Sequence, residues 1–139
     1  MYTYNYPRAA LTVDAIVFVK EENEIFVLLI ERGRDPFKNK WALPGGFIEM
    51  DETLETACKR ELLEETGLVV DKMTQFKTYD AIDRDPRHRT ISVVFSVELK
   101  EKQPVNGGDD ASGAGWFQVA DLPELAFDHN QILTDFFKL

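Results

Sequence analysis

The sequence feature that most constrains the fold is residues 53–66, which predict a helix with glutamates on its buried side. This run contains no Gly or Pro and is rich in Leu, Glu, Ala, Lys and Arg, a composition that favours a helix. Thr53 is placed to cap the start of the helix, and Gly67 is placed to end it in a left-handed conformation. Both ends of the helix are therefore predicted from local sequence alone.

The acidic residues of this helix are not where stability alone would place them. An advance of about 100° per residue defines an apolar stripe of Leu54, Ala57, Cys58 and Leu62. Glu61, Glu64 and Glu65 fall on or beside this stripe, where they repel one another. They also oppose the helix dipole, at a cost of roughly 0.3–1 kcal/mol each when exposed. A divalent cation such as Mg²⁺, which takes oxygen ligands, would explain the cluster. The alternative is a solvated acidic helix end.

Residues 46–68 match the pattern G-x5-E-x7-R-E-U-x-E-E-x-G-U, in which U is apolar, at every specified position. These positions are Gly46, Glu52, Arg60, Glu61, Leu62, Glu64, Glu65, Gly67 and Leu68. The pattern is the Nudix box, and the chain resembles the Nudix hydrolases. The resemblance implies an α/β fold, a Nudix-type α/β/α sandwich with a mixed central sheet between helices. It also implies Mg²⁺- or Mn²⁺-dependent attack of water on a pyrophosphate that joins a nucleoside to another group.

The resemblance assigns metal-binding roles within the box. Glu61 and Glu65 are implied metal ligands, and Glu64 is either a further ligand or the catalytic base. A backbone carbonyl at Gly45 or Gly46 is a further implied ligand, and Gly46 is the one inside the box.

Other positions of the box have supporting roles by the same resemblance. Arg60 orients the acids, Glu52 braces the loop before the helix, and Gly67 ends the helix. The spacing of Arg60 and Glu64, one helical turn apart, independently favours an ion pair between them.

Length and charge exclude several classes of protein. A chain of 139 residues with 44% apolar content predicts one domain over residues 1–139. The net charge of −9 argues against nucleic acid or an anionic membrane as a partner. The single cysteine, Cys58, lies on the apolar stripe and is predicted to be a buried thiol. Together with the absence of a signal-peptide pattern at the N-terminus, this predicts a cytoplasmic protein.

The remaining elements are predicted from apolar runs and breaker residues. Residues 25–30, IFVLLI, are continuously apolar, which indicates a strand covered on both faces. Asp128 is the expected N-cap of a last helix that ends at Phe137, and His129 is expected to bond the backbone there rather than to act in catalysis. The predicted strands are 11–20 and 24–31, as an antiparallel pair, then 73–81, 90–99 and a short strand at 116–119.

Two charged turns carry candidate phosphate-binding residues. Residues 32–40 follow the second strand and residues 82–89 precede the strand at 90–99. Arginine binds phosphate through two parallel hydrogen bonds. The alternatives are a solvated turn for the first segment and salt bridges to Asp83 and Asp85 for the second. The candidates are Arg32, Arg34, Lys40, Arg84, Arg87 and Arg89.

Residues 103–115 predict a Gly-rich loop that contains the adjacent acids Asp109 and Asp110. In several Nudix enzymes the loop at this place carries an extra acid that binds metal or acts as the base. Asp110 is the candidate base by that resemblance, with Glu64 as the alternative. The alternative is that residues 103–115 are only a flexible connector and take no part in catalysis.

Four segments narrow the substrate class. TVDAIVF, DPFKNKWALPGGFIE, YDAIDRDPRHRTISVVF and LAFDH resemble bacterial and archaeal ADP-ribose pyrophosphatases, although Ile82 stands where that group often has Pro. The resemblance implies cleavage of ADP-ribose to AMP and ribose 5-phosphate, and a homodimer is common in the group. One alternative is a hydrolase of nucleoside triphosphates or other nucleoside diphosphate derivatives. The other is a module that senses ADP-ribose without hydrolysing it.

Overall fold

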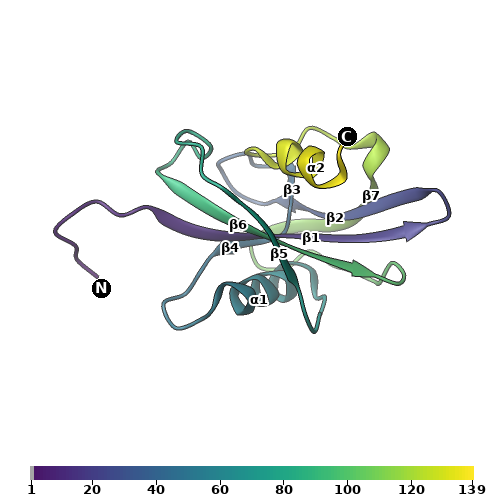
Figure 1. Cartoon of the computed structure of the whole chain (residues 1–139), viewed down its shortest axis with the longest axis horizontal. Helices are drawn as coiled ribbons and strands as arrows, with labels where there is room; N and C mark the ends of the chain where they lie inside the picture. Colours follow the sequence, from purple (N-terminus) through teal and green to yellow (C-terminus); the bar gives the residue numbers. More distant parts are fainter. Residues whose placement is uncertain (1) are drawn as a thin grey trace.

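The computed structural model describes residues 2–139. Its strands form one mixed sheet, and α1 and α2 lie on opposite faces of it (Figure 1). This arrangement confirms the predicted α/β/α sandwich. The elements are β1 (Ala10–Glu21), β2 (Glu24–Arg32), β3 (Trp41–Ala42), β4 (Gly45–Phe47), α1 (Leu54–Thr66), β5 (Thr74–Tyr79), β6 (Thr90–Leu99), β7 (Ala111–Gln118), the 3₁₀ turn η1 (Val119–Asp121) and α2 (His129–Phe137).

The sheet is built around β1, which runs parallel to β6 on one side. On its other side β1 has two antiparallel partners: β2 pairs with residues 18–21 and β4 pairs with residues 12–14. The turn between β3 and β4 enters where these two partners separate, and Ala15 donates its N–H to the carbonyl of Pro44 there, at 2.8 Å. The segment between β3 and β4 therefore approaches α1 at the split in the sheet, the point where the partner of β1 changes from β2 to β4.

Two apolar cores lie on the two faces of the sheet, and β2 contributes to both. Leu28 packs with Leu62 of α1, whereas Leu29 packs with Ile132 of α2. Successive side chains of a strand point to opposite faces, so a strand buried on both sides is continuously apolar. The prediction that this strand is covered on both faces is confirmed.

Helix α1 begins and ends at the predicted residues. The Thr53 hydroxyl accepts the N–H of Thr56 at 3.2 Å, and Gly67 has a φ of 77° while it donates its N–H to the Leu63 carbonyl. These two contacts satisfy backbone groups that a helix leaves unpaired at its ends. Residues 57, 58, 62 and 65 are buried, so the face that turns from apolar to acidic points inward as predicted.

The Gly-rich segment differs from its prediction as a loop. Strand β7 begins at Ala111 and pairs with β2 across Leu28 and Trp116. Sequence composition missed the first half of this strand because Gly and Ala there have weak intrinsic preference for strands.

Asp128 does not cap α2 with its side chain, although the helix begins at His129 as expected. Its carboxylate instead accepts two hydrogen bonds from Arg84, at 2.9 and 2.6 Å. A guanidinium donates to both oxygens at once, which makes this a stronger arrangement than a cap bond. Among the described helices, none has the length and hydrophobicity needed to span a bilayer.

Candidate active site

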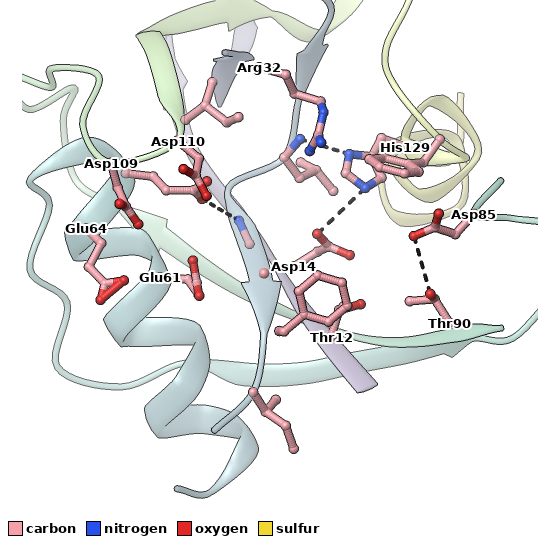
Figure 2. A pocket seen from close by; sticks show the side chains of 18 of the residues that line it. Thr12, Asp14, Arg32, Glu61, Glu64, Asp85, Thr90, Asp109, Asp110 and His129 are labelled. Carbon is pink, nitrogen blue, oxygen red and sulfur yellow. Dashed lines mark hydrogen bonds and ion pairs between the residues drawn. The ribbon is translucent and has the colours of Figure 1, made fainter. Parts of the chain in front are cut away.

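A pocket of about 550 Å³ opens where the sheet splits, between the acidic end of α1 and the start of α2. Glu61, Glu64 and Glu65 line its α1 side, and Phe127 and His129 line the opposite side. Figure 2 shows Asp14 between these two sides. Nine carboxylates and five guanidiniums line the pocket, so an anionic ligand needs additional positive charge to bind there.

The three glutamates of α1 differ in exposure and in contacts. Glu65 is 6% exposed and accepts the Gly45 N–H at 2.7 Å. Glu61 lies so close to the backbone of Gly46 that a Cβ added there would be 2.6 Å from the Glu61 carboxyl carbon. Glu64 is the most exposed of the three, with 38% of its side chain accessible.

Arg60 contacts the other charged residues of the helix. Its guanidinium donates to both oxygens of Glu52, and its Nη1 donates to Glu61 at 2.9 Å and to Glu64 at 3.2 Å. It also donates to the carbonyl of Phe47. The ion pair that the spacing of Arg60 and Glu64 predicted is therefore present. These bonds hold Arg60 at a fixed orientation beside the pocket carboxylates.

Burial and mutual repulsion change the acidity of these glutamates. Burial raises the pKa of Glu65 to about 8, with smaller contributions from Glu61 and Asp14, against the lowering effect of the Gly45 N–H. Burial also raises the pKa of Glu61, although Arg60 opposes that shift. Without a cation at this site, Glu65 thus prefers the protonated form near neutral pH.

The candidate phosphate-binding residues divide into two groups. Arg32, Arg34, Arg84 and Arg87 line the pocket. Lys40 instead pairs with Glu124 at 3.2 Å, and Arg89 donates to the backbone carbonyls of Asp80 and Ala81. Neither of these two residues lines the pocket, so we do not retain them as substrate contacts.

The four candidate phosphate-binding arginines that line the pocket are not equally free to bind a ligand. Arg84 has 4% of its side chain exposed and is paired with Asp128, and Arg87 is paired with Asp85 at 2.8 Å. The salt-bridge alternative therefore describes both, although the partner of Arg84 is Asp128 and not a neighbouring aspartate. Arg34 pairs with Asp110.

Arg32 is the exception among the pocket arginines. Within residues 2–139 it has no ion-pair partner, and its Nε donates to the carbonyl of Pro36 at 2.7 Å. Burial and the nearby Arg87 lower the pKa of its guanidinium, which nevertheless stays charged. Its terminal nitrogens are thus the guanidinium donors most available to a ligand.

The two loop acids have different surroundings. Asp110 faces Arg34, whereas Asp109 lies on the side of the glutamates and raises the pKa of Glu61 (Figure 2). The loop is held against the end of α1 because Gly108 donates its N–H to the Glu65 carbonyl at 3.1 Å. The assignment of Asp110 as base stays a prediction, and the structure adds Asp109 as the acid that is nearer to α1.

Comparison with known protein families decides the classification of the chain. The NUDIX domain matches residues 9–136. The chain belongs to the Nudix family. This Nudix protein is 43% identical over 133 residues to an ADP-ribose pyrophosphatase of Methanocaldococcus jannaschii, a match that covers 96% of this chain and 76% of that protein. It is 33% identical to the ADPR responsive transcriptional repressor NtrR of Acinetobacter baylyi, over 96% of this chain and 55% of that protein.

Solved structures of Nudix proteins have the same fold. The Nudix domain of Shewanella oneidensis NrtR in complex with ADP ribose superimposes with a TM-score of 0.87 at 33% identity, covering 96% of this chain and 89% of that one. A bifunctional NMN adenylyltransferase/ADP ribose pyrophosphatase of Francisella tularensis, with AMP and a Mn ion, has a TM-score of 0.83 at 32% identity. That match covers 97% of this chain and 43% of the other. This chain therefore spans less than half of the Francisella protein.

The donor atoms of the Nudix box fit a hard divalent cation. Glu61, Glu64 and Glu65 provide only oxygens, and the glycine at position 46 leaves the Glu61 carboxylate next to the backbone. As they stand, the side chains in the described part of the chain form no group of three that would hold a metal ion. Glu61 and Glu64 are held by Arg60 instead. Glutamate side chains can rotate to share a cation, and Mg²⁺ and Mn²⁺ prefer such oxygen ligands.

Sequence analysis did not single out Asp14 or the two aromatic side chains of the pocket. Asp14 is 7% exposed and accepts the Ser92 hydroxyl. Phe47 and Phe127 flank the guanidinium of Arg87, with ring centres 5.4 and 5.8 Å from its Cζ. A lone carboxylate inside the apolar run of β1 was a detectable signal for Asp14, because buried charges are rare without a partner. Nothing in the sequence distinguished these two phenylalanines from the others.

Proposed function

We propose that this protein hydrolyses the pyrophosphate bond of ADP-ribose to give AMP and ribose 5-phosphate. The observation that carries the proposal is one pocket in which the glutamates of the Nudix box face Arg32, a guanidinium without a carboxylate partner in the described chain. Carboxylates that bind a cation and a guanidinium that binds phosphate are the two groups that pyrophosphate hydrolysis requires. The similarity to an ADP-ribose pyrophosphatase over 96% of the chain supports the choice of substrate.

A divalent cation, Mg²⁺ or Mn²⁺, is part of the proposal, with Glu61, Glu65 and the Gly46 carbonyl as ligands and Glu64 as a further one. When bound, it supplies positive charge for the phosphates and makes coordinated water more acidic. Arg60 keeps Glu61 and Glu64 beside the pocket, since its guanidinium donates to both carboxylates.

The chemical step needs one proton acceptor beside the pocket. Water attacks one phosphorus atom, the bond from that phosphorus to the bridging oxygen breaks, and the proton of the water passes to a carboxylate. Glu64, Asp109 and Asp110 are the candidates for that carboxylate, and all three line the pocket. Arg32 holds the phosphates, with Arg34 and Arg87 available after release from Asp110 and Asp85.

We propose further properties of the whole protein from its charge and family. The net charge of −9 supports a protein that binds neither nucleic acid nor anionic membranes. A cytoplasmic location and a homodimeric assembly complete the proposal.

The test is a comparison of substrates with purified protein and Mg²⁺. ADP-ribose, other nucleoside diphosphate sugars, dinucleoside polyphosphates and nucleoside triphosphates are incubated in parallel, and products are separated by ion-exchange chromatography. We expect ADP-ribose to have the highest kcat/KM and to give AMP and ribose 5-phosphate in equal amounts. A higher kcat/KM for a nucleoside triphosphate would show that the triphosphate, and not ADP-ribose, is the preferred substrate.

A second candidate function is sensing of ADP-ribose, which the 33% identity to the repressor NtrR favours. A sensor would bind ADP-ribose and leave it intact. Calorimetric binding and a single-turnover assay on the same sample separate the two functions. We expect conversion of the bound nucleotide, because the Nudix box is complete at every specified position.

A further inference from the structure

His129, at the start of α2, lies on the side of the pocket opposite the glutamates, and it is 4% exposed. Its Nδ1 accepts the backbone N–H of Leu43 at 3.0 Å. A nitrogen that accepts a hydrogen bond carries no proton, so the proton of the neutral ring is on Nε2. That nitrogen faces Asp14 Oδ1 at 3.6 Å (Figure 2). The contacts of His129 therefore select a single neutral tautomer.

Asp14 supports this orientation from β1. Its other oxygen accepts the Ser92 hydroxyl of β6, so the carboxylate is fixed between β6 and α2. The charged groups around the His129 ring are Asp14 on β1, Asp128 before α2, Arg84 before β6 and Arg32 on β2. Burial lowers the pKa of His129, and the two aspartates oppose that effect while the two arginines add to it. The neutral ring that the geometry requires is consistent with this balance.

Leu43 begins the turn that carries the backbone from β3 to the glutamates. Within residues 43–46, the Leu43 N–H bonds His129, the Pro44 carbonyl bonds Ala15, and the Gly45 N–H bonds Glu65. Each contact comes from a different element: α2, β1 and α1. The turn is therefore attached to three elements through its backbone.

Gly45 and Gly46, the last two residues of segment 43–46, bring its backbone into direct contact with the sheet and with Glu61. A Cβ on Gly45 would lie 2.2 Å from the Val13 carbonyl, and a Cβ on Gly46 would lie 2.6 Å from the Glu61 carboxyl carbon. No side chain separates the turn from the sheet on one side or from Glu61 on the other. Any displacement at Leu43 must therefore move the backbone against which Glu61 and Glu65 are placed.

We propose that His129 is a positioning residue of the pyrophosphatase site: by accepting the Leu43 N–H, it holds the backbone of residues 43–46 against Glu61 and Glu65. The inference rests on the proposed hydrolytic function but concerns a residue outside the Nudix box. His129 acts from the far side of the sheet, through the backbone, and does not touch the reacting atoms. The role requires an acceptor at the position of Nδ1, and it does not require an imidazole.

The requirement for an acceptor defines a matched pair of substitutions. In His129→Asn the amide oxygen can occupy the place of Nδ1, whereas His129→Leu fills similar space and offers no acceptor. We expect His129→Leu to lower kcat by about 10–100-fold and to weaken binding of Mn²⁺ alone, as loss of outer contacts to metal ligands typically does. We expect His129→Asn to retain most of both, even if its smaller side chain makes it the less stable variant.

The measurements are kcat, KM, melting temperature and the dissociation constant of Mn²⁺ by electron paramagnetic resonance. Lower kcat and weaker Mn²⁺ binding in His129→Leu but not in His129→Asn, whichever of the two has the lower melting temperature, support the positioning role. Equal losses in His129→Asn and His129→Leu would overturn it. Full activity and Mn²⁺ affinity in a folded His129→Leu would overturn it as well.

Two readouts test the inference independently of substrate turnover. In ¹⁵N spectra of the wild-type protein, His129 should show a protonated Nε2 and an unprotonated Nδ1. The Leu43 amide should exchange with solvent more slowly in wild type and His129→Asn than in His129→Leu. If no pyrophosphate substrate is hydrolysed, the proposed function fails, whereas the Mn²⁺ and exchange results still decide the role of His129. A ring protonated on Nδ1 would contradict the inference directly.

Discussion

Arg60 and Glu52 are joined by two parallel hydrogen bonds, from Nε to Oε2 at 2.9 Å and from Nη2 to Oε1 at 2.6 Å. Glu52 in turn accepts the N–H of Glu49, so the pair attaches α1 to the loop that precedes it. A planar guanidinium can make this paired contact and still donate to Glu61, which a lysine ammonium cannot do.

This geometry predicts the effect of Arg60→Lys. We expect kcat to fall by about 10–100-fold, as for other residues that orient metal ligands, while the protein stays folded. Steady-state kinetics with saturating Mg²⁺ and a melting curve measure the two effects. Lys59→Arg is the matched control, because Lys59 lies on the same helix and pairs with Glu55 away from the pocket. Unchanged kcat in Arg60→Lys would mean that a single positive charge at this position is sufficient to orient the glutamates.

The raised pKa of Glu65, about 8, predicts how stability of the metal-free protein depends on pH. Because this pKa is above the unfolded value of 4.5, the folded state binds the proton more tightly. Its contribution is fully present below about pH 4.5 and is lost as pH rises through about 8. We therefore expect the melting temperature of Glu65→Gln, relative to wild type, to increase between about pH 5 and pH 9.

Thermal melts in the presence of a chelator measure this difference. Glu101→Gln is the control, since Glu101 is an exposed loop residue. Saturating Mg²⁺ should stabilise wild type at high pH and have little effect on Glu65→Gln. A melting-temperature difference that is the same at all pH values would contradict the assignment of the titration to Glu65.

Arg32 and Arg84 should respond differently to replacement by alanine. Arg84→Ala removes one partner of a mostly buried pair and leaves Asp128 without it, so we expect a loss of about 3 kcal/mol in stability. Arg32→Ala should raise KM for ADP-ribose and lower the melting temperature less than Arg84→Ala does, because it loses the hydrogen bond to Pro36 but no ion pair in the described chain. KM and melting temperature measured on both variants separate the roles. A stable Arg84→Ala with a raised KM would restore Arg84 as a phosphate ligand.

Three carboxylates compete for the role of base, and asparagine or glutamine substitutions rank them. We expect Asp109→Asn to lower kcat more than Asp110→Asn, because Asp109 is on the side of Glu61 and Asp110 is paired with Arg34. The pH dependence of kcat in each variant identifies the group whose ionisation is lost. If both loop variants keep most of their kcat while Glu64→Gln abolishes it, the helix provides the base.

The parts of the fold that were predictable have local causes. The ends of α1 depend on Thr53 and Gly67, which act on backbone groups within four residues, and the double-sided burial of β2 is a property of its own apolar run. The partner of Arg84 was not predictable, because Arg84 and Asp128 are far apart in sequence and meet only when α2 packs on the sheet. The contact between Asp14 and His129 is likewise made only by packing, although Asp14 alone was detectable as a carboxylate inside an apolar run. Pairings made by tertiary packing have no signature in the sequence around either partner.

The parallel pairing of β1 with β6 has a consequence for how the chain acquires its site during synthesis. Ala10 pairs with Thr90, so the centre of the sheet cannot form until residues 90–99 have been synthesised. Pairings between distant segments are slow to form, and partly folded chains expose apolar strands while they wait. Helix α1 and its glutamates leave the ribosome well before β6 does. The nascent protein therefore carries its acidic cluster without the sheet that gives it a pocket until most of the chain has been translated.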